Sequence, residues 1–164
     1  MKKWILTGII VIVAIIGILL AISFSGNNDE RKEVYAFRDF LDKEYTPTMD
    51  KVVVHIEESG KKIDIGGVSG WYLLDGGFEE NLDLQLELKT AKEKIVNEEP
   101  EYADTFRYKA NIMKQIDLLE DLLQDLITYK DEKDVIKVIF NSKLDELTDN
   151  IDEMSEILEE HYNQ

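Results

Sequence analysis

Two histidines, His55 and His161, are the side chains of this sequence best suited to bind a metal ion or to carry a proton. A carboxylate-bridged di-metal site in a helical bundle needs a Glu three residues before each His, but Val52 and Leu158 occupy those positions. Zinc would need more His or Cys ligands, and the chain has no cysteine. We therefore predict no metal site. His55 is interpreted as a helix-surface or edge residue, and His161 as a cation suited to the last turn of a helix.

Ser69 lies in the glycine-rich run GGVSG, residues 66–70. A phosphate-binding loop needs a different glycine spacing and a following Lys-Ser or Lys-Thr. A nucleophilic serine needs a base and an orienting group, and no serine here has an elbow-type glycine motif around it. We predict no catalytic residue and no cofactor. An extracytoplasmic enzyme that acts on envelope material, with paired carboxylates, is the alternative.

Acidic residues are the most abundant polar groups, with 35 Asp and Glu against 19 Lys and Arg and a net charge of −16. A dedicated calcium loop needs alternating oxygen ligands, a glycine and a final glutamate. The acidic runs at 117–125 and 145–156 lack the glycine and have helical composition. We interpret them as solvated helix faces, on which weak binding of divalent cations stays open. The charge also opposes binding to nucleic acid and favours a protein or cationic ligand as partner.

The stretch GGVSGWYLLDGG, residues 66–77, interrupts an otherwise helical pattern and holds five of the nine glycines. Its apolar centre has two interpretations. The four side chains fill a groove that a short second helix leaves open, with Ser69 capping one helical turn and the glycine pairs supplying unusual dihedral angles. Alternatively, they are exposed and bind a partner, because Trp and Tyr often anchor interfaces. The candidate partner-binding residues are Trp71, Tyr72, Leu73 and Leu74.

Residues 4–22 contain no charged side chain. As a helix they span about 28 Å, close to the hydrocarbon core of a bilayer. We predict that residues 1–27 are a transmembrane signal anchor and linker, with cleavage after Ser23 as the alternative. Lys2 and Lys3 favour a cytoplasmic N-terminus. The expected location is the cell membrane, with a single pass and with most of the chain, 28–164, outside the cytoplasm. Gly17 and Ala21 would permit close packing of two such helices, which leaves the oligomeric state open.

Apolar residues at intervals of three and four predict four helices over residues 29–60, 78–97, 100–129 and 134–162. Pro47 predicts a kink in the first helix, and Gly60 predicts its end. The fourth helix has a heptad pattern typical of coiled coils. In the second helix, Leu82 and Leu86 lie opposite the main apolar face, so we expect that helix to contact neighbours on two sides.

Two segments also have strand character. Residues 52–56 are rich in β-branched side chains, and residues 82–89 alternate between apolar and polar. A small sheet is therefore an alternative for these segments. We favour helix, because residues 78–99 are dense in helix formers and contain no turn signal.

The run EEPEYADTFRYKANIMKQIDLLEDLLQDL, residues 98–126, resembles the helical ectodomains of small membrane-tethered or lipid-anchored surface proteins of low-GC Gram-positive bacteria. The resemblance is one of composition and implies an all-α fold at the cell surface, without implying any site residue. The missing cysteine departs from the lipid-anchored members. The expected protein is all-α, with an N-terminal transmembrane helix followed by an antiparallel three- to four-helix bundle. We expect it to act as a non-catalytic binding or adaptor protein, with a structural subunit of a membrane complex as a further alternative.

Overall fold

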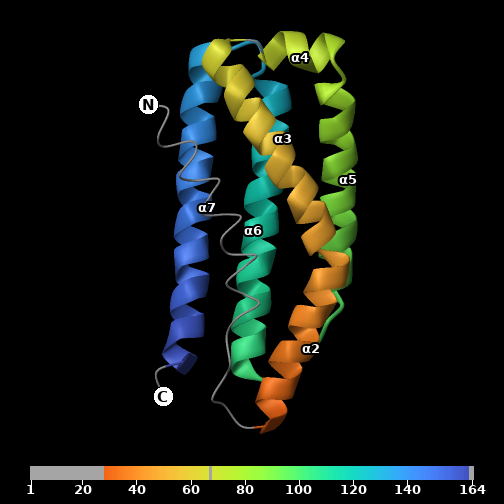
Figure 1. The fold of residues 1–164 in the computed structure, drawn as a ribbon, viewed down its shortest axis with the longest axis vertical. Coiled ribbons are helices and arrows are strands. Elements are labelled where there is room, and N and C mark those ends of the chain that lie inside the picture. The colour runs from red at the N-terminus through yellow and green to blue at the C-terminus, as the bar shows by residue number, and fades with distance from the viewer. Residues whose placement is uncertain (1–27, 67, 163–164) are drawn as a thin grey trace.

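A computed structural model describes residues 28–66 and 68–162, and their regular secondary structure is helical throughout (Figure 1). The helices are α2 (Asn28–Glu44), α3 (Thr46–Ile65), α4 (Val68–Leu74), α5 (Gly77–Val96), α6 (Ala103–Thr128) and α7 (Lys133–Tyr162). The predicted all-α class is confirmed. The sheet alternative is wrong, because residues 52–56 lie within α3 and residues 82–89 within α5.

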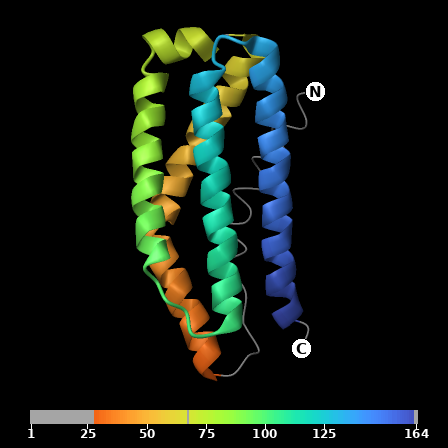
Figure 2. The ribbon, with the colours of Figure 1, turned by 180° about the vertical axis from the view of Figure 1, so that it is seen from behind.

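The helices form an antiparallel bundle with one short helix across its end (Figure 1). α2 and α3 together make one bent rod, and α5, α6 and α7 run alternately down, up and down beside it (Figure 2). We call the end with the start of α2 and the α5–α6 connection the base. The opposite end, with α4 and the α6–α7 turn, is the tip. α4 lies across the tip, where it joins the top of α3 to the top of α5 (Figure 1).

Each helix contributes one apolar face to a shared core, as the 3/4 spacing predicts. The predicted stripe of the α2–α3 rod is buried along its whole length, and so are the predicted faces of α5 and α7 wherever their side chains are described. α6 lies in the middle and packs against α2, α5 and α7. The most deeply buried core residues, with 0 % of their surface exposed, are Val52, Leu88, Ile95, Ile116, Leu119, Leu122, Leu123 and Leu126.

The rod bends at Tyr45, between α2 and α3. Pro47 lies in the first turn of α3, where a missing N–H costs no helical hydrogen bond. The Tyr45 hydroxyl is buried and donates a hydrogen bond to Gln115 Oε1 of α6 at 2.9 Å. The predicted kink is therefore confirmed, and the side chain at the bend fixes the rod to the central helix.

Gly60 does not end the first rod, so that prediction is wrong. α3 continues to Ile65 and ends at Gly66, whose φ of 73° is the left-handed conformation that favours glycine. Gly60 is buried inside α3, and the helix there tolerates the roughly 1 kcal/mol that an internal glycine costs.

Several predictions fall outside the described part of the chain or fail within it. The predicted transmembrane helix lies in residues 1–27, which are outside the described residues. Within residues 28–66 and 68–162, no helix combines the length and apolar character needed to cross a bilayer. His161 does lie in the last turn of α7. Phe106, which the 3/4 spacing within residues 100–129 would place on an apolar face, is instead 61 % exposed, because it lies on the outer side of α6 near the base.

Candidate binding site at the tip of the bundle

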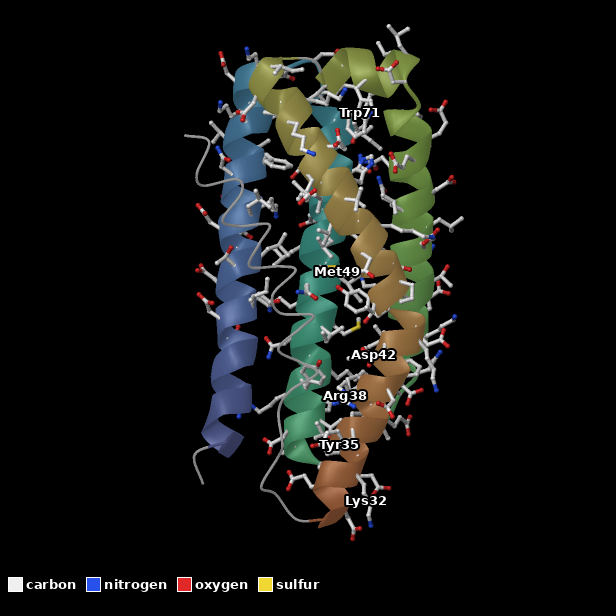
Figure 3. All side chains as sticks on the ribbon, in the orientation of Figure 1. Lys32, Tyr35, Arg38, Asp42, Met49 and Trp71 are labelled. Atoms are coloured by element: carbon white, nitrogen blue, oxygen red, sulfur yellow. The ribbon has the colours of Figure 1, made fainter. Side chains whose placement is uncertain are left out.

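α4 divides the four candidate residues between the core and the surface. Trp71 and Tyr72 are 8 % and 2 % exposed, whereas Leu73 and Leu74 are 70 % and 83 % exposed. Figure 3 shows Trp71 beneath α4, in the space between α3 and α5. The packing interpretation is therefore confirmed for the aromatic pair, which fills the gap at the tip. The leucine pair faces solvent, and its binding to a partner stays a prediction.

The indole of Trp71 is packed closely from two sides. A Cβ atom added to Gly77, the first residue of α5, would lie 2.8 Å from the indole ring, so only glycine fits there without a shift. The imidazole of His55 lies on another side, with ring centroids 5.0 Å apart. The Lys62 ammonium lies 5.9 Å from the indole centroid, within range of a cation–π contact. Gly76 supplies the positive φ of 80° that turns the chain from α4 into α5.

A buried polar cluster lies beside Trp71 and joins four helices. The Asn81 amide of α5 donates to the Tyr72 hydroxyl of α4 at 2.7 Å and to the backbone carbonyl of Leu123 in α6 at 3.1 Å. Gln85 donates in turn to Asn81 Oδ1 at 2.7 Å. His55 Nε2 of α3 lies 3.3 Å from the Tyr72 hydroxyl. These bonds satisfy polar groups that would be costly to bury unpaired, so they fix the position of α4.

His55 is 1 % exposed, so the prediction of a surface or edge residue is wrong. Burial lowers the pKa of His55, and the carboxylate of Glu80, 3.2 Å from Nδ1, opposes that shift in part. The contact is close enough for an ion pair, but Nδ1 is poorly aligned for a hydrogen bond to the carboxylate. His55 therefore favours its neutral form inside the bundle. Burial also raises the pKa of the Tyr72 phenol, which keeps its proton.

Ser69 connects α4 to the far side of the tip. It was predicted to cap a helical turn, but α4 begins at Val68, so Ser69 lies within the helix. Its hydroxyl donates to a carboxylate oxygen of Asp131, in the turn between α6 and α7. That bond, together with Lys130, lowers the pKa of Asp131. The contact adds a further tie that holds α4 across the tip.

The outer side of the tip continues along α5 as a row of exposed apolar side chains. Leu74, Phe78, Leu82 and Leu86 are spaced four residues apart and are 83 %, 36 %, 45 % and 65 % exposed. We call these four residues the outer stripe. The prediction that Leu82 and Leu86 contact a second neighbour is wrong for the part of the chain that the structure describes, because α5 packs inward through Leu84, Leu88, Ala91 and Ile95.

The polar cluster and the outer stripe differ in what they can do chemically. His55, Tyr72 and Asn81 have at most 2 % of their surface exposed, so a dissolved substrate does not reach them without opening α4. No group of three or more potential metal ligands comes together among the described side chains. A shallow groove of about 540 Å³ between α5 and α6 is lined by Lys92 and Glu120, which already pair with each other. The outer stripe, in contrast, is exposed and can be reached by a partner.

Comparisons with known proteins yield no relative from which a function would transfer. No family model matches the chain, and no curated protein or solved structure is significantly similar to it.

The polar cluster was missed by the sequence analysis, although a signal for it exists. Val52, His55, Ile56 and Ser59 follow 3/4 spacing, so His55 and Ser59 share the buried face of α3. In α5, Asn81 continues the buried face of Leu84 and Leu88 by one turn. Polar residues at positions where the periodicity demands apolar ones indicate a buried network.

Proposed function

We propose that this chain is a single-pass, membrane-anchored protein whose bundle lies outside the cytoplasm and acts as a non-catalytic binding or adaptor module at the cell surface. One observation carries the proposal. A charge-free stretch at residues 4–22 precedes a bundle whose opposite end presents exposed leucines on a firmly held helix. An anchor and a distant contact surface are the two parts that such a module needs.

The arrangement of the bundle supports presentation away from a membrane. α2 starts at the base, directly after the predicted anchor and linker, and α4 lies at the tip (Figure 1). α6 has 26 residues and reaches from base to tip, a distance of about 39 Å for a helix of that length. An N-terminal anchor would therefore place the exposed leucines of α4 far from the bilayer, where a partner meets them first.

The closed polar cluster supports a binding role over an enzymatic one. A catalytic His or Tyr must come within hydrogen-bond reach of its substrate. His55 and Tyr72 instead pack against Trp71 and contact each other inside the bundle, where the Asn81 amide binds the Tyr72 hydroxyl. The exposed leucines offer no reactive group, but they offer apolar area, which drives protein association.

Single cysteines test the anchor and the topology directly, because the native chain has none. Lys3→Cys, Asn27→Cys and Glu160→Cys would be expressed as full chains and treated in intact cells with a membrane-impermeant maleimide. We expect labelling at 27 and 160, and labelling at position 3 only after lysis. Labelling of position 160 only in lysed cells would refute the extracytoplasmic bundle.

The mass of the mature chain tests whether the anchor is retained. We expect the full-length mass in the membrane fraction, with the protein resisting extraction by carbonate at high pH. A chain that begins after Ser23 and is found outside the membrane would refute the retained anchor and leave a released bundle.

A further inference from the structure

We propose that the outer stripe is a docking surface for a cationic amphipathic helix of a partner protein or peptide. The stripe consists of Leu74 at the end of α4 and Phe78, Leu82 and Leu86 on α5. This inference rests on the proposed binding role and names the surface and the chemistry of its partner.

The geometry of the stripe fits a helix. Residues four apart on a helix lie on one face, one above the other, so Phe78, Leu82 and Leu86 form an apolar ridge along α5. Leu74 precedes this ridge at the end of α4, across the turn at Gly76. From Phe78 to Leu86 the ridge extends about 12 Å, or a little over two helical turns. A partner helix with apolar residues at three- and four-residue intervals would pack its own ridges beside this one.

The acidic side chains beside the outer stripe favour a basic partner helix. Asp75, Glu79 and Asp83 lie along the stripe and are exposed, and none of the three carboxylates pairs with a cation within the described part of the chain. Acidic groups on the inner edges of α5 differ in this respect, because Glu87 pairs with Lys51 and Glu80 contacts His55. Three free carboxylates beside an apolar ridge complement lysines or arginines that flank an apolar face.

The same charges disfavour two other occupants. A second copy of the chain would bring a second net charge of −16 to the contact, and an anionic lipid surface would also be repelled. Lys89 follows Leu86 by about one turn and is the exposed cation nearest in sequence to the stripe. Its charge would repel a basic partner, so we expect the docking surface to end there.

The tip holds the upper end of the stripe in place. α4 is fixed by Trp71 and by the hydrogen bonds of Tyr72, so Leu74 does not have to be ordered when a partner binds. A surface that is already ordered binds more tightly, because less conformational entropy is lost on association.

The test uses the full chain in phosphatidylcholine nanodiscs and a fluorescent, 18-residue synthetic peptide of leucine and lysine with leucines at helical spacing. A peptide with the same leucines and glutamate in place of lysine is the control, and binding to empty nanodiscs is subtracted. We expect the basic peptide to bind with an affinity that falls as the salt concentration rises. The acidic peptide should bind at least tenfold more weakly. Equal binding of the two peptides would overturn the inference.

Matched variants locate the binding. Leu82→Glu should weaken binding of the basic peptide at least tenfold, and the Glu79→Gln, Asp83→Asn double variant should weaken it severalfold and reduce its salt dependence. Phe106→Ser removes an apolar side chain at the base that is more exposed than Leu82, at 61 % against 45 %, and should leave binding unchanged. Unchanged thermal unfolding of each variant shows that the fold is intact.

Two outcomes overturn the proposed site. In the first, the basic peptide binds to the Leu82→Glu variant as tightly as to the native chain. In the other outcome, sedimentation shows the native chain to be a dimer that Leu82→Glu dissociates, and the occupant is then a second copy. Either result leaves the topology experiment untouched, so failure of the docking surface and failure of the proposed location are distinguishable.

Discussion

The tip and the base of the bundle are held together by different kinds of contact. At the tip, neutral side chains from α3, α4 and α5 bond to one another beneath the surface, with Asn81 and Tyr72 at the centre. At the base, charged side chains bond to free backbone groups at helix ends. Glu33 of α2 accepts the backbone N–H groups of Glu101 and Tyr102 at 2.9 and 3.1 Å, just before α6.

The base also uses a lysine in the complementary role. The Lys109 ammonium donates to the backbone carbonyls of Val96 and Glu98, where α5 ends. A carboxylate at a helix start and a cation at a helix end both suit the helix dipole. Such contacts are partly exposed and are therefore screened by salt, whereas the buried bonds of the tip are not.

The two ends differ in how strictly their contacts fix the position of the chain. A connection between two helices is secured at the base by contacts that tolerate substitution. At the tip, buried amide, imidazole and phenol groups hold one seven-residue helix, α4, in place. Such buried networks specify a single arrangement. That precision is needed if α4 presents Leu73 and Leu74 in a fixed position.

The largest effect is expected at Trp71. Trp71→Ala would leave a cavity between α3, α4 and α5 and should lower the free energy of unfolding by about 3–5 kcal/mol. Leu73→Ala, the neighbouring exposed position, should change it by less than about 0.5 kcal/mol. Urea denaturation followed by circular dichroism measures both. Equal losses for the two variants would contradict the division of α4 into a buried and an exposed side.

Asn81→Ala tests the polar cluster itself. It would leave the Tyr72 hydroxyl and the Leu123 carbonyl without the amide that binds them, at a cost of about 1–3 kcal/mol. Asn97→Ala, at an exposed position after α5, is the control and should cost little. A stability loss at Asn81 no larger than at Asn97 would show that the cluster does not hold the tip.

Gly77→Ala tests the close approach of α5 to the indole. The new methyl group would meet the ring at 2.8 Å and should destabilise the protein by about 1–3 kcal/mol through overpacking. Gly70→Ala, within α4, meets no atom within 4 Å and should be neutral or stabilising, because alanine favours helix. Thermal unfolding of the two variants gives the comparison, and a stable Gly77→Ala variant would contradict the observed packing.

Glu33→Ala tests the base and should cost only about 1 kcal/mol, as loss of a helix-capping group usually does. Glu33→Gln keeps an acceptor oxygen without the charge and should recover part of the loss. The cost should shrink in high salt, unlike that of Asn81→Ala. A salt-independent loss at Glu33 would remove the contrast between the two ends.

The smallest expected effect on stability is that of pH, which should act on the tip and the base in different ranges. The folded-state pKa of His55 is below its unfolded value of about 6.5. As the pH falls, His55 is therefore protonated in the unfolded chain before it is protonated in the folded chain. Stability from neutral His55 is complete above pH ~6.5 and is lost as the pH falls through the folded pKa. His55→Gln should flatten this slope in urea denaturation between pH 7.5 and 5, and an unchanged slope would contradict it.

Glu33 responds in a lower pH range. Burial raises the pKa of Glu33, but the N–H groups of Glu101 and Tyr102 outweigh it and hold the pKa below its ordinary value. Its contribution is therefore present above the unfolded pKa and is lost only as the pH falls below about 4.5. The tip should weaken first on acidification, and the base second.

Periodicity was sufficient to predict the helices and most of the core. Apolar side chains recur every three or four residues along the rod, from Val34 to Ile56, and along α7, from Ile136 to Ile151. Each predicted apolar position in these two stretches is buried. Such a pattern has only one way to bury its face, so the sequence predicts it well. Pro47 likewise predicts the bend, because its ring acts locally.

Tertiary packing decided the predictions that failed. Gly60 and Leu82 have local signals for a helix end and a buried contact, but the space around each residue is set by distant helices. The split of α4 depends on the close fit of Trp71 against Gly77 and His55, which no spacing rule reveals. The polarity of His55 favours a surface position, but its spacing from Val52 and Ser59 places it on the buried face of α3. The candidate partner contacts at Leu73 and Leu74 stay predictions until a binding experiment tests them.

The contact between Trp71 and His55 gives this protein an internal optical probe. The chain has two tryptophans, and Trp71 is the one that the structure describes. A protonated imidazole quenches indole fluorescence more strongly than a neutral one. With ring centroids 5.0 Å apart, the emission of Trp71 would report the protonation of its neighbour and the seating of α4 in real time, without any added label.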